Sequence, residues 1–204
     1  MRRWKVPAAD AKRAAMACAL DRIGITGASG CGVTTLGAAL AARLGAVHID
    51  TDDHYWMATD PPYQERRDVP ERLESIAAEQ ARTGRWIISG TLDRWAEPAI
   101  ADAGLIVFLE VPTPVRLERL RAREQARFGA MLLPGGAMHE TPREFIEWAA
   151  HYEDGTLPGR SRPKHEKWLA GLAQPVLRLD GTLPTEELAA AVLTQPGRLY
   201  HHSV

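Results

Sequence analysis

The stretch Gly27-Ala28-Ser29-Gly30-Cys31-Gly32-Val33-Thr34-Thr35 decides how the rest of the sequence is interpreted. It follows a short β-prone segment, residues 22–26, and precedes leucines at positions 36, 40 and 44, whose spacing predicts a helix over residues 34–44. Glycines let a backbone bend around an anion with its N–H groups pointing inward, and the following helix presents its positive N-terminal end to the same point. A strand, a glycine-rich loop and a helix in this order therefore predict a cradle for phosphate groups.

The loop departs from the P-loop consensus G-x-x-x-x-G-K-[ST] at one position, because Val33 stands where that motif has lysine. Valine cannot neutralise the charge of phosphates, and the loss of one preorganised charge contact costs about 10²–10³ in rate where nothing replaces it. Either another cation takes over, or the protein binds nucleotide without fast turnover. Thr34 occupies the position whose hydroxyl coordinates magnesium, and Thr35 is placed to bond a further phosphate oxygen. Cys31 lies near a helix N-terminus, where a thiol pKa can fall, but we favour a packing role.

Strand-like and helical segments alternate along the chain. Strands are expected over residues 22–26, 46–49, 86–88, 105–109 and 176–179, and helices over residues 8–20, 34–44, 70–82, 114–128 and 185–193. This alternation predicts an α/β fold, the three-layer α/β/α P-loop NTPase fold, with a five-stranded parallel sheet in one domain over residues 1–204. Residues 127–175 form a helical lid-like insertion, which is either a mobile lid or a packed helical subdomain.

Composition excludes several classes of protein. The 204 residues carry a formal net charge of −1, which gives no reason to expect a nucleic-acid partner. Two cysteines cannot form a disulfide framework, and no apolar run approaches the roughly 18 residues of a membrane span. We therefore expect a cytoplasmic protein that needs no membrane.

An acidic segment follows the second expected strand. Asp50, Asp52 and Asp53 lie at a strand end, which in a parallel sheet is the edge where ligands bind. One carboxylate there can hold magnesium while a second accepts the proton of an attacking hydroxyl. The alternative is a solvated acidic turn.

With these motifs the sequence resembles the nucleoside monophosphate kinase and shikimate kinase group of P-loop kinases over residues 22–193. Asp50-Thr51-Asp52 is similar to the Asp-Ser/Thr-Asp element of shikimate kinases. The resemblance implies that Asp50 serves the metal together with Thr34, and that Asp52, or its neighbour Asp53, binds the acceptor hydroxyl as the base.

The same resemblance assigns roles to arginines. Arg119 and Arg123 match the paired lid-helix arginines of adenylate kinases, and a spacing of four puts both on one helix face. It implies that Arg119 lies against the adenine and that both stabilise transferred charge. The alternative is a solvated basic face. Arg160 and Arg162 match returning lid arginines, and Lys164 lies near enough in sequence to supply the absent lysine charge.

Two further segments resemble parts of these kinases. Residues 179–184, with Gly181, are similar to the loop that contacts the adenine edge, although a helix start also explains them. Residues 89–94 resemble a phosphate-binding segment only loosely, and Arg94 is its candidate ligand.

Aromatic and basic residues lie between the second strand and its helix. Tyr55 is placed to stack on a ring of the acceptor, and Arg66 and Arg67 are placed to bind an acidic group. The aromatic residues are equally well explained as the core of a small flap.

The sequence thus predicts an ATP-dependent phosphotransferase that uses ATP and Mg²⁺ and acts on a small hydroxyl- or phosphate-bearing acceptor. A non-catalytic nucleotide-binding module and a slow ATPase are the alternatives, and the acceptor is not identified.

Overall fold

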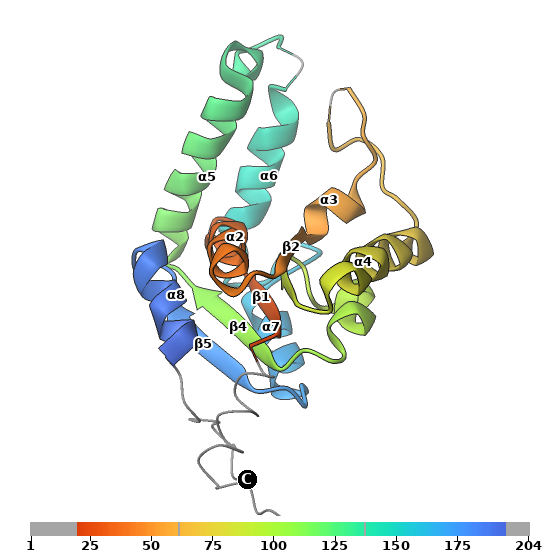
Figure 1. The fold of residues 1–204 in the computed structure, drawn as a ribbon. Coiled ribbons are helices and arrows are strands. Elements are labelled where there is room, and N and C mark those ends of the chain that lie inside the picture. The colour runs from red at the N-terminus through yellow and green to blue at the C-terminus, as the bar shows by residue number, and fades with distance from the viewer. Residues whose placement is uncertain (1–19, 61, 137, 195–204) are drawn as a thin grey trace, which may run out of the picture.

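The structure is a computed structural model that describes residues 20–60, 62–136 and 138–194. The described residues form the expected five-stranded parallel sheet, with the strands in the order β2-β3-β1-β4-β5 (Figure 1). The strands are β1 (Arg22–Gly27), β2 (Val47–Asp50), β3 (Trp86–Ser89), β4 (Leu105–Glu110) and β5 (Val176–Asp180). The helix expected over residues 8–20 lies, apart from Leu20, outside the described residues.

Helices account for most of the remaining chain. They are α2 (Val33–Leu44), α3 (Thr51–Tyr55), α4 (Val69–Thr83), α5 (Thr113–Phe128), α6 (Glu140–Ala150), α7 (Arg162–Ala170) and α8 (Thr185–Thr194), with 3-10 turns η1 (Arg94–Ile100) and η2 (Gly129–Leu132). α4 begins with Pro70 in its first turn and ends at Gly84, whose φ of 69° suits a residue without a side chain. Sequence patterns predicted α2, α4, α5 and α8 but missed α3 and η1. α6 and α7 were expected only as an undivided helical insertion over residues 127–175.

Alternating strand residues divide the core into two layers. Ile23 and Ile25 of β1 pack in one cluster with Leu36 and Leu40 of α2 and with α8. Ile88 of β3 and Ile106 and Phe108 of β4 pack in the other cluster, with residues of α4, η1 and α7. Because successive side chains of a strand point to opposite faces, both faces of the sheet are covered, and the expected three-layer architecture is confirmed.

The insertion between β4 and β5 has two structurally different parts. α5 and α6 pack against each other as a pair that extends away from the sheet (Figure 1). α7 instead packs on the sheet, where Leu169 is buried with Ile49, Trp86 and Ile88. The segment after α6 therefore belongs to the core of the domain. None of the helices in the described part of the chain is long and apolar enough to cross a membrane.

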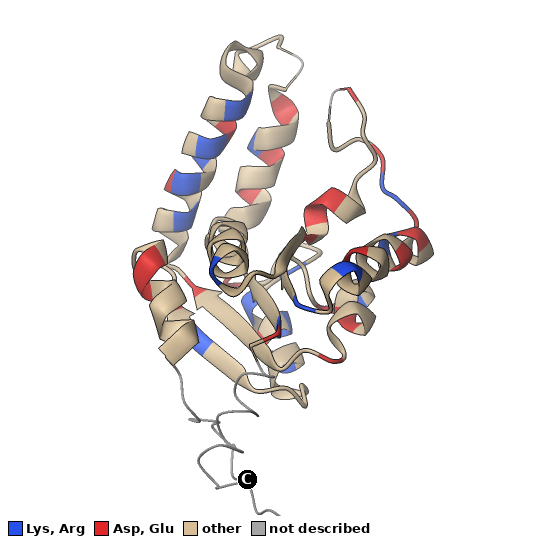
Figure 2. Cartoon of the chain, viewed as in Figure 1, with Lys and Arg blue, Asp and Glu red and all other residues tan. Residues whose placement is uncertain are grey.

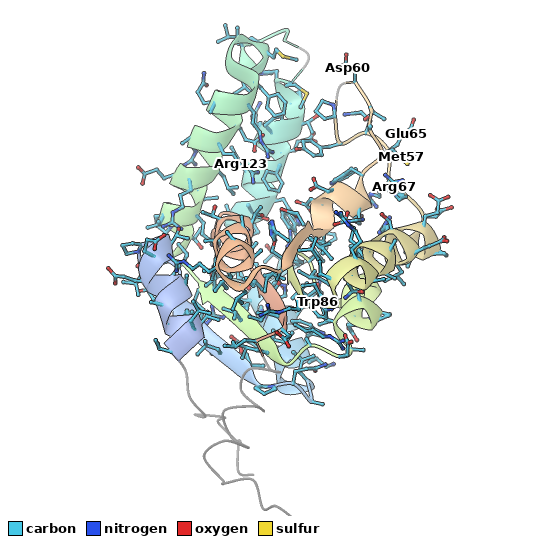
Figure 3. The ribbon with its side chains drawn as sticks, viewed as in Figure 1. Met57, Asp60, Glu65, Arg67, Trp86 and Arg123 are labelled. Carbon is cyan, nitrogen blue, oxygen red and sulfur yellow. The ribbon has the colours of Figure 1, made fainter. Side chains whose placement is uncertain are left out.

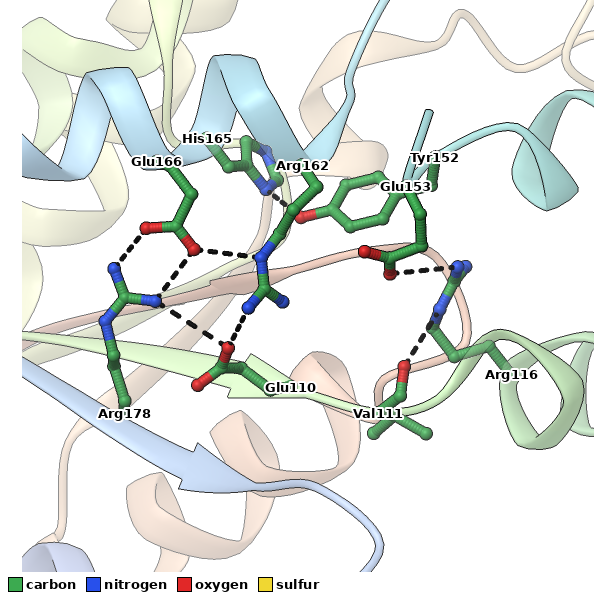
Figure 4. Close-up of polar contacts among 9 residues, drawn as sticks. All are labelled: Glu110, Val111, Arg116, Tyr152, Glu153, Arg162, His165, Glu166 and Arg178. Carbon is green, nitrogen blue, oxygen red and sulfur yellow. Dashed lines mark hydrogen bonds and ion pairs between the residues drawn. The ribbon is translucent and has the colours of Figure 1, made fainter. Parts of the chain in front are cut away.

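A buried arginine, Arg116, joins the insertion to the glycine-rich loop. Its guanidinium donates to the backbone carbonyls of Val111 at 3.2 Å, Ser29 at 3.2 Å and Ala149 at 3.3 Å, and to the Thr113 hydroxyl at 2.8 Å. Glu153 lies 3.8 Å away (Figure 4). Arg116 is 0% exposed, so its guanidinium has no contact with water and depends on these oxygens as acceptors. The contact fixes the glycine-rich loop relative to the start of α5 and the end of α6.

Ion pairs fasten α7 to the strand ends. Arg162 and Arg178 both pair with Glu110 and with Glu166, which links β4, α7 and β5 (Figure 4). Beside them the Tyr152 hydroxyl is hydrogen-bonded to His165 Nδ1 at 2.8 Å. Burial, assisted by the charge of Arg160, lowers the pKa of His165 to about 4.

The pKa of His165 predicts an acid-sensitive contribution to stability. An unfolded histidine takes up its proton near pH 6.5, whereas the folded one does so only near pH 4. The unfolded state therefore binds more protons between these values, and stability is lost as the pH falls through this window and is complete above it. From pH 7 to pH 5 we expect wild type to lose about 1–2 kcal/mol more than His165→Gln, measured by urea unfolding. Equal losses in the two proteins would contradict this.

Removal of Arg116 should destabilise the protein strongly. Arg116→Met leaves the buried carbonyls of Val111 and Ala149 and the part-buried carbonyl of Ser29 without their donor, and we expect the free energy of unfolding to fall by about 2–4 kcal/mol. Arg121→Met, on an exposed face of the same helix, is the matched control and should change it by less than about 0.5 kcal/mol. Urea unfolding of both variants checks the prediction, which fails if the two are equally stable.

Candidate functional site

The glycine-rich loop runs from the end of β1 into α2 as a tight turn. Gly30 and Gly32 have φ angles of 86° and 90°, in the left-handed region that favours glycine. Gly32 is the N-cap of α2 and has no side chain to satisfy the first N–H groups of the helix. A Cβ at Gly32 would meet no described atom within 4 Å, so the loop is open at this point. These are the features of an anion cradle, with backbone N–H donors at the positive end of a helix.

The underside of the loop is closely packed. A Cβ on Gly30 would lie 2.7 Å from the backbone oxygen of Arg116, and one on Gly27 would lie 2.7 Å from that of Leu109. Cys31 is 2% exposed within the core, and burial raises the pKa of its thiol to about 11. Cys31 therefore packs as a neutral thiol, in agreement with the packing role favoured from the sequence.

A hydrogen bond joins the loop to the acidic segment. Thr34 Oγ1, in the first turn of α2, donates to Asp50 Oδ2 at 2.7 Å, although the two residues lie on different elements. Asp50 Oδ1 accepts from the backbone N–H of Asp52 at 3.0 Å and so caps α3. The predicted metal ligands are thus adjacent, and they present the hydroxyl and carboxylate oxygens that Mg²⁺ prefers.

The acidic segment is a short helix, α3, in which Asp52 and Asp53 are exposed. Asp52 and Asp53 lie in the first turn of α3, which is red in Figure 2, and successive helix residues point in directions about 100° apart. Desolvation by the surrounding protein and the negative charge of Asp50 raise the pKa of Asp52, although the Asp52 side chain is accessible to solvent. The charges of Arg160 and Arg123 oppose that rise. The structure therefore brings the carboxylate of Asp52 close to two of the predicted arginines.

Two hydrogen bonds hold the strand ends around this segment. Thr51 Oγ1 accepts from the backbone N–H of Thr91 at 2.8 Å, which joins α3 to the chain after β3. His48 Nε2 is 2.9 Å from Ser89 Oγ, and this joins β2 to β3. Gly37 permits α2 to lie over His48, since a Cβ there would be 2.5 Å from the imidazole. His48 and Thr51 are therefore structural residues of the site.

Arginines recur along the length of α5, which carries several blue bands in Figure 2. Arg119 Nη1 donates to the carbonyl of Gly181 at 3.0 Å, and a Cβ on Gly181 would be 3.1 Å from the carbonyl of Cys31. Arg119, the candidate adenine loop and the glycine-rich loop are thus adjacent. Arg123 (Figure 3) pairs with the neighbouring Glu124 at 2.7 Å, and its guanidinium lies 5.6 Å from the centre of the Phe145 ring.

The two returning arginines have different surroundings. Arg160 Nη2 donates to Ser29 Oγ of the glycine-rich loop at 3.3 Å. Arg162 is in the ion-pair cluster with Glu110 and Glu166. The structure therefore brings Arg160, but not Arg162, into contact with the loop.

The stretch between α3 and α4 folds back on itself. Trp56 and Arg66 form an isolated antiparallel bridge, and the Arg66 guanidinium lies 5.8 Å from the centre of the Tyr55 ring. Arg72, which sequence reasoning missed, lies 3.9 Å from the same ring. Arg67 Nε donates to the carbonyl of His54 at 3.2 Å (Figure 3). Arginines of the chain itself stack on Tyr55, as expected of the core of a small flap.

The segment after β3 contains a second missed residue, Asp93. Its side chain is 6% exposed, and its Oδ1 has no hydrogen-bond partner among the described residues. Burial raises the pKa of this carboxyl, and the charge of Arg160 opposes the rise. Arg94 is exposed at the start of η1 with a φ of 62°, and its backbone N–H donates to Glu97 at 2.9 Å. A buried aspartate in an otherwise polar segment has no distinctive sequence signal.

The described residues contain no group of three or more His, Cys, Asp or Glu side chains placed to hold a metal. Mg²⁺ usually keeps several water ligands and takes only one or two from protein, with the rest from substrate phosphates. The pair Thr34 and Asp50 beside the glycine-rich loop fits this mode of binding, whereas a dedicated metal cage is not found in this part of the chain.

Comparisons with known proteins place the chain in a family. Residues 23–128, from β1 to the end of α5, match the model of the AAA domain. The chain is 40% identical over 171 residues to YqaC of Bacillus subtilis (strain 168), an uncharacterized protein, and the match covers 84% of this chain and 94% of that protein.

Solved structures with related folds include a gluconokinase from Sinorhizobium meliloti 1021, with 18% identity and a TM-score of 0.46 over 85% of this chain and 90% of that one. Another is the shikimate kinase of Aquifex aeolicus, with 18% identity and a TM-score of 0.45 over 84% of this chain and 93% of that one. The match over residues 23–128 shows that the chain belongs to the AAA domain family. YqaC is a relative of the chain, and the five-stranded parallel sheet has the P-loop NTPase fold.

Proposed function

We propose that the protein is an ATP-dependent phosphotransferase acting on a small acceptor that bears a hydroxyl or phosphate group. The observation that carries the proposal is the hydrogen bond between Thr34 and Asp50, because it joins the phosphate cradle to the acidic segment that holds Asp52. A cradle alone would support nucleotide binding. A carboxylate beside it supports transfer to a second substrate.

On the nucleotide side, the loop 27–32 and the N-terminus of α2 would hold the phosphates of ATP through backbone N–H groups. Thr34 and Asp50 would hold Mg²⁺, which when bound neutralises charge on the phosphates. Arg119 would lie beside the adenine, since it is fixed against Gly181 next to the loop. Thr35, exposed one residue after Thr34, is available to a further phosphate oxygen.

On the acceptor side, Asp52 would bind the attacking hydroxyl and accept its proton as the bond from the acceptor oxygen to the γ-phosphorus forms. The bond from the γ-phosphorus to the β–γ bridging oxygen breaks in the same transfer, and ADP leaves. Asp53 is the other candidate base, although it projects from α3 in a different direction. Arg123, which is paired with Glu124 in this structure, would stabilise the transferred charge, the role that its match to the lid-helix arginines implies. Arg66, Arg67, Arg94 and Arg162 carry no role in this proposal, since their contacts in the structure are to the chain itself.

A binding module that does not catalyse transfer, or a slow ATPase, is the second candidate. Val33 favours it, because the glycine-rich loop carries no positive side chain of its own. The two candidates differ in one respect, which is transfer to an acceptor.

Replacement of Asp50, the candidate metal ligand, should weaken the binding of ATP in the presence of Mg²⁺ much more than in its absence. Asp50→Asn removes one anionic oxygen, so we expect ATP affinity with Mg²⁺ to fall about tenfold or more, while affinity without Mg²⁺ changes less than about twofold. Isothermal titration of both proteins with and without the metal measures this. An equal change under the two conditions would show that Asp50 does not serve the metal.

Transfer itself is tested with a screen of nucleosides, nucleoside monophosphates and small sugar or cyclic alcohols, with ADP release and acceptor phosphorylation measured together. For any acceptor that is phosphorylated, Asp52→Asn should lower kcat by about 10²–10⁴ and leave the Kd for MgATP within about threefold, because a general base acts only during transfer.

Asp53→Asn, one residue along α3, is the matched variant. A loss of kcat in Asp53→Asn alone would assign the base to Asp53. Binding of ATP with no acceptor phosphorylated would favour the binding module.

A further inference from the structure

The glycine-rich loop has to obtain its positive charge from elsewhere in the fold. The side chain of Val33 is half-buried and packs against the core cluster that contains Ile23 and Leu36. It contributes to the core and leaves the mouth of the loop without a cation. Any compensating charge must come from a side chain that reaches the loop from another element.

We propose that Arg160, on the loop between α6 and α7, supplies the charge that lysine provides in the P-loop consensus. This inference rests on the proposed function, since it concerns the same phosphate site. Arg160 Nη2 already donates to Ser29 Oγ at 3.3 Å, and Ser29 is within the glycine-rich loop itself. A guanidinium presents several N–H donors in one plane, which matches the oxygens of a phosphate group.

Packing around Arg160 holds it in this position. Its guanidinium lies 5.8 Å from the centre of the Trp148 ring, within the range of a cation–π contact. Trp148 Nε1 in turn donates to the carbonyl of Pro158 at 2.8 Å, which ties α6 to the loop that carries Arg160. Gly159, with a φ of 105°, allows the close approach, because a Cβ there would be 3.2 Å from the indole nitrogen.

The charge of Arg160 is also unneutralised at close range. Within the described ranges, no carboxylate forms an ion pair with it at 4 Å or less, although Asp52 and Asp93 are near enough for its charge to act on them. A guanidinium that contacts the phosphate cradle and forms no ion pair with a carboxylate of the described residues has its charge available to a bound phosphate.

The other cations near the site are engaged elsewhere. Lys164 Nζ donates to the carbonyl of Gly159 at 2.7 Å, so it supports the Arg160 loop instead of reaching the glycine-rich loop. Arg162 is in the ion-pair cluster with Glu110 and Glu166, and Arg123 is paired with Glu124. Arg116 lies beneath the loop, where its donors are used by Ser29, Val111, Thr113 and Ala149.

The test combines positions 33 and 160 and reads nucleotide affinity as well as turnover. Wild type, Arg160→Met, Val33→Lys and the double variant are titrated calorimetrically with MgATP, MgADP and AMP. Arg160→Met should weaken MgATP binding at least tenfold and leave AMP binding within about twofold, because the lost charge acts on the outer phosphates. Lysine at position 33 should restore most of the MgATP affinity in the Arg160→Met background and add little to wild type.

Three further variants control the result. Arg121→Met removes a charge from an exposed face of α5 and should leave MgATP affinity unchanged. Arg160→Lys keeps the charge without the planar fork and should retain affinity between wild type and Arg160→Met. Lys164→Met should change affinity less than Arg160→Met does. Circular dichroism and thermal melts establish that each variant is folded.

The outcomes separate this inference from the proposed function. If wild type binds MgATP and Arg160→Met binds it equally well, or if Lys164→Met is the damaging variant, the role of Arg160 is overturned while nucleotide binding stands. If Arg160→Met weakens MgATP and Val33→Lys restores it but no acceptor is phosphorylated, the role of Arg160 stands and transfer does not. If wild type does not bind MgATP at millimolar concentration, both are overturned.

Discussion

The buried guanidinium of Arg116 is the contact on which the geometry of the site depends. It donates to backbone carbonyls of the glycine-rich loop, of the chain entering α5 and of the end of α6. Three segments that are far apart in sequence therefore share one charged donor with no access to water. A buried charge of this kind is costly unless all of its partners are in place, so the loop, α5 and α6 are constrained to one arrangement. The segment after α6 that carries Arg160 is brought to the loop as a consequence.

Acidic and basic side chains both lie around the loop, and together they determine which ligands the site can bind. Asp50 faces the hydroxyl of Thr34, Asp52 follows at the start of α3, and Asp93 is buried nearby with an oxygen that has no described partner. Arg160 and Arg123 act on Asp52 from the insertion. Carboxylates from β2, α3 and the start of η1 and arginines from the insertion, next to a row of backbone donors, are suited to holding a polyanion together with a second, neutral or acidic, substrate. Asp50 would serve the nucleotide through its metal, which leaves Asp52 for a second substrate.

Much of the fold could be predicted from the sequence, because the strands are short apolar runs and α2, α4 and α5 carry clear periodicity or end signals. α6 and α7 were expected only as an undivided helical insertion, because each is short and has loop-forming glycines and prolines on either side. α7 is stabilised by Leu169 in the core and by ion pairs with distant residues. The phosphate loop was predictable because its glycines are required by the local backbone conformation, in which Gly30 and Gly32 have positive φ angles. The roles of Arg116 and Asp93 were not, since burial of a charged residue is decided by the elements packed around it. For Arg160 the sequence predicted a role at the site, but only the structure distinguishes it from Arg162, which pairs with Glu110.

The central claim is that this P-loop draws its phosphate-binding charge from Arg160 in place of the lysine it lacks. A crystal structure with Mg²⁺ and a non-hydrolysable ATP analogue tests this most directly. The account predicts the Arg160 guanidinium within about 3.2 Å of a β- or γ-phosphate oxygen, with Thr34 Oγ1 on the magnesium. A structure in which Arg160 faces solvent while Arg123 or Lys164 contacts the phosphates would contradict it.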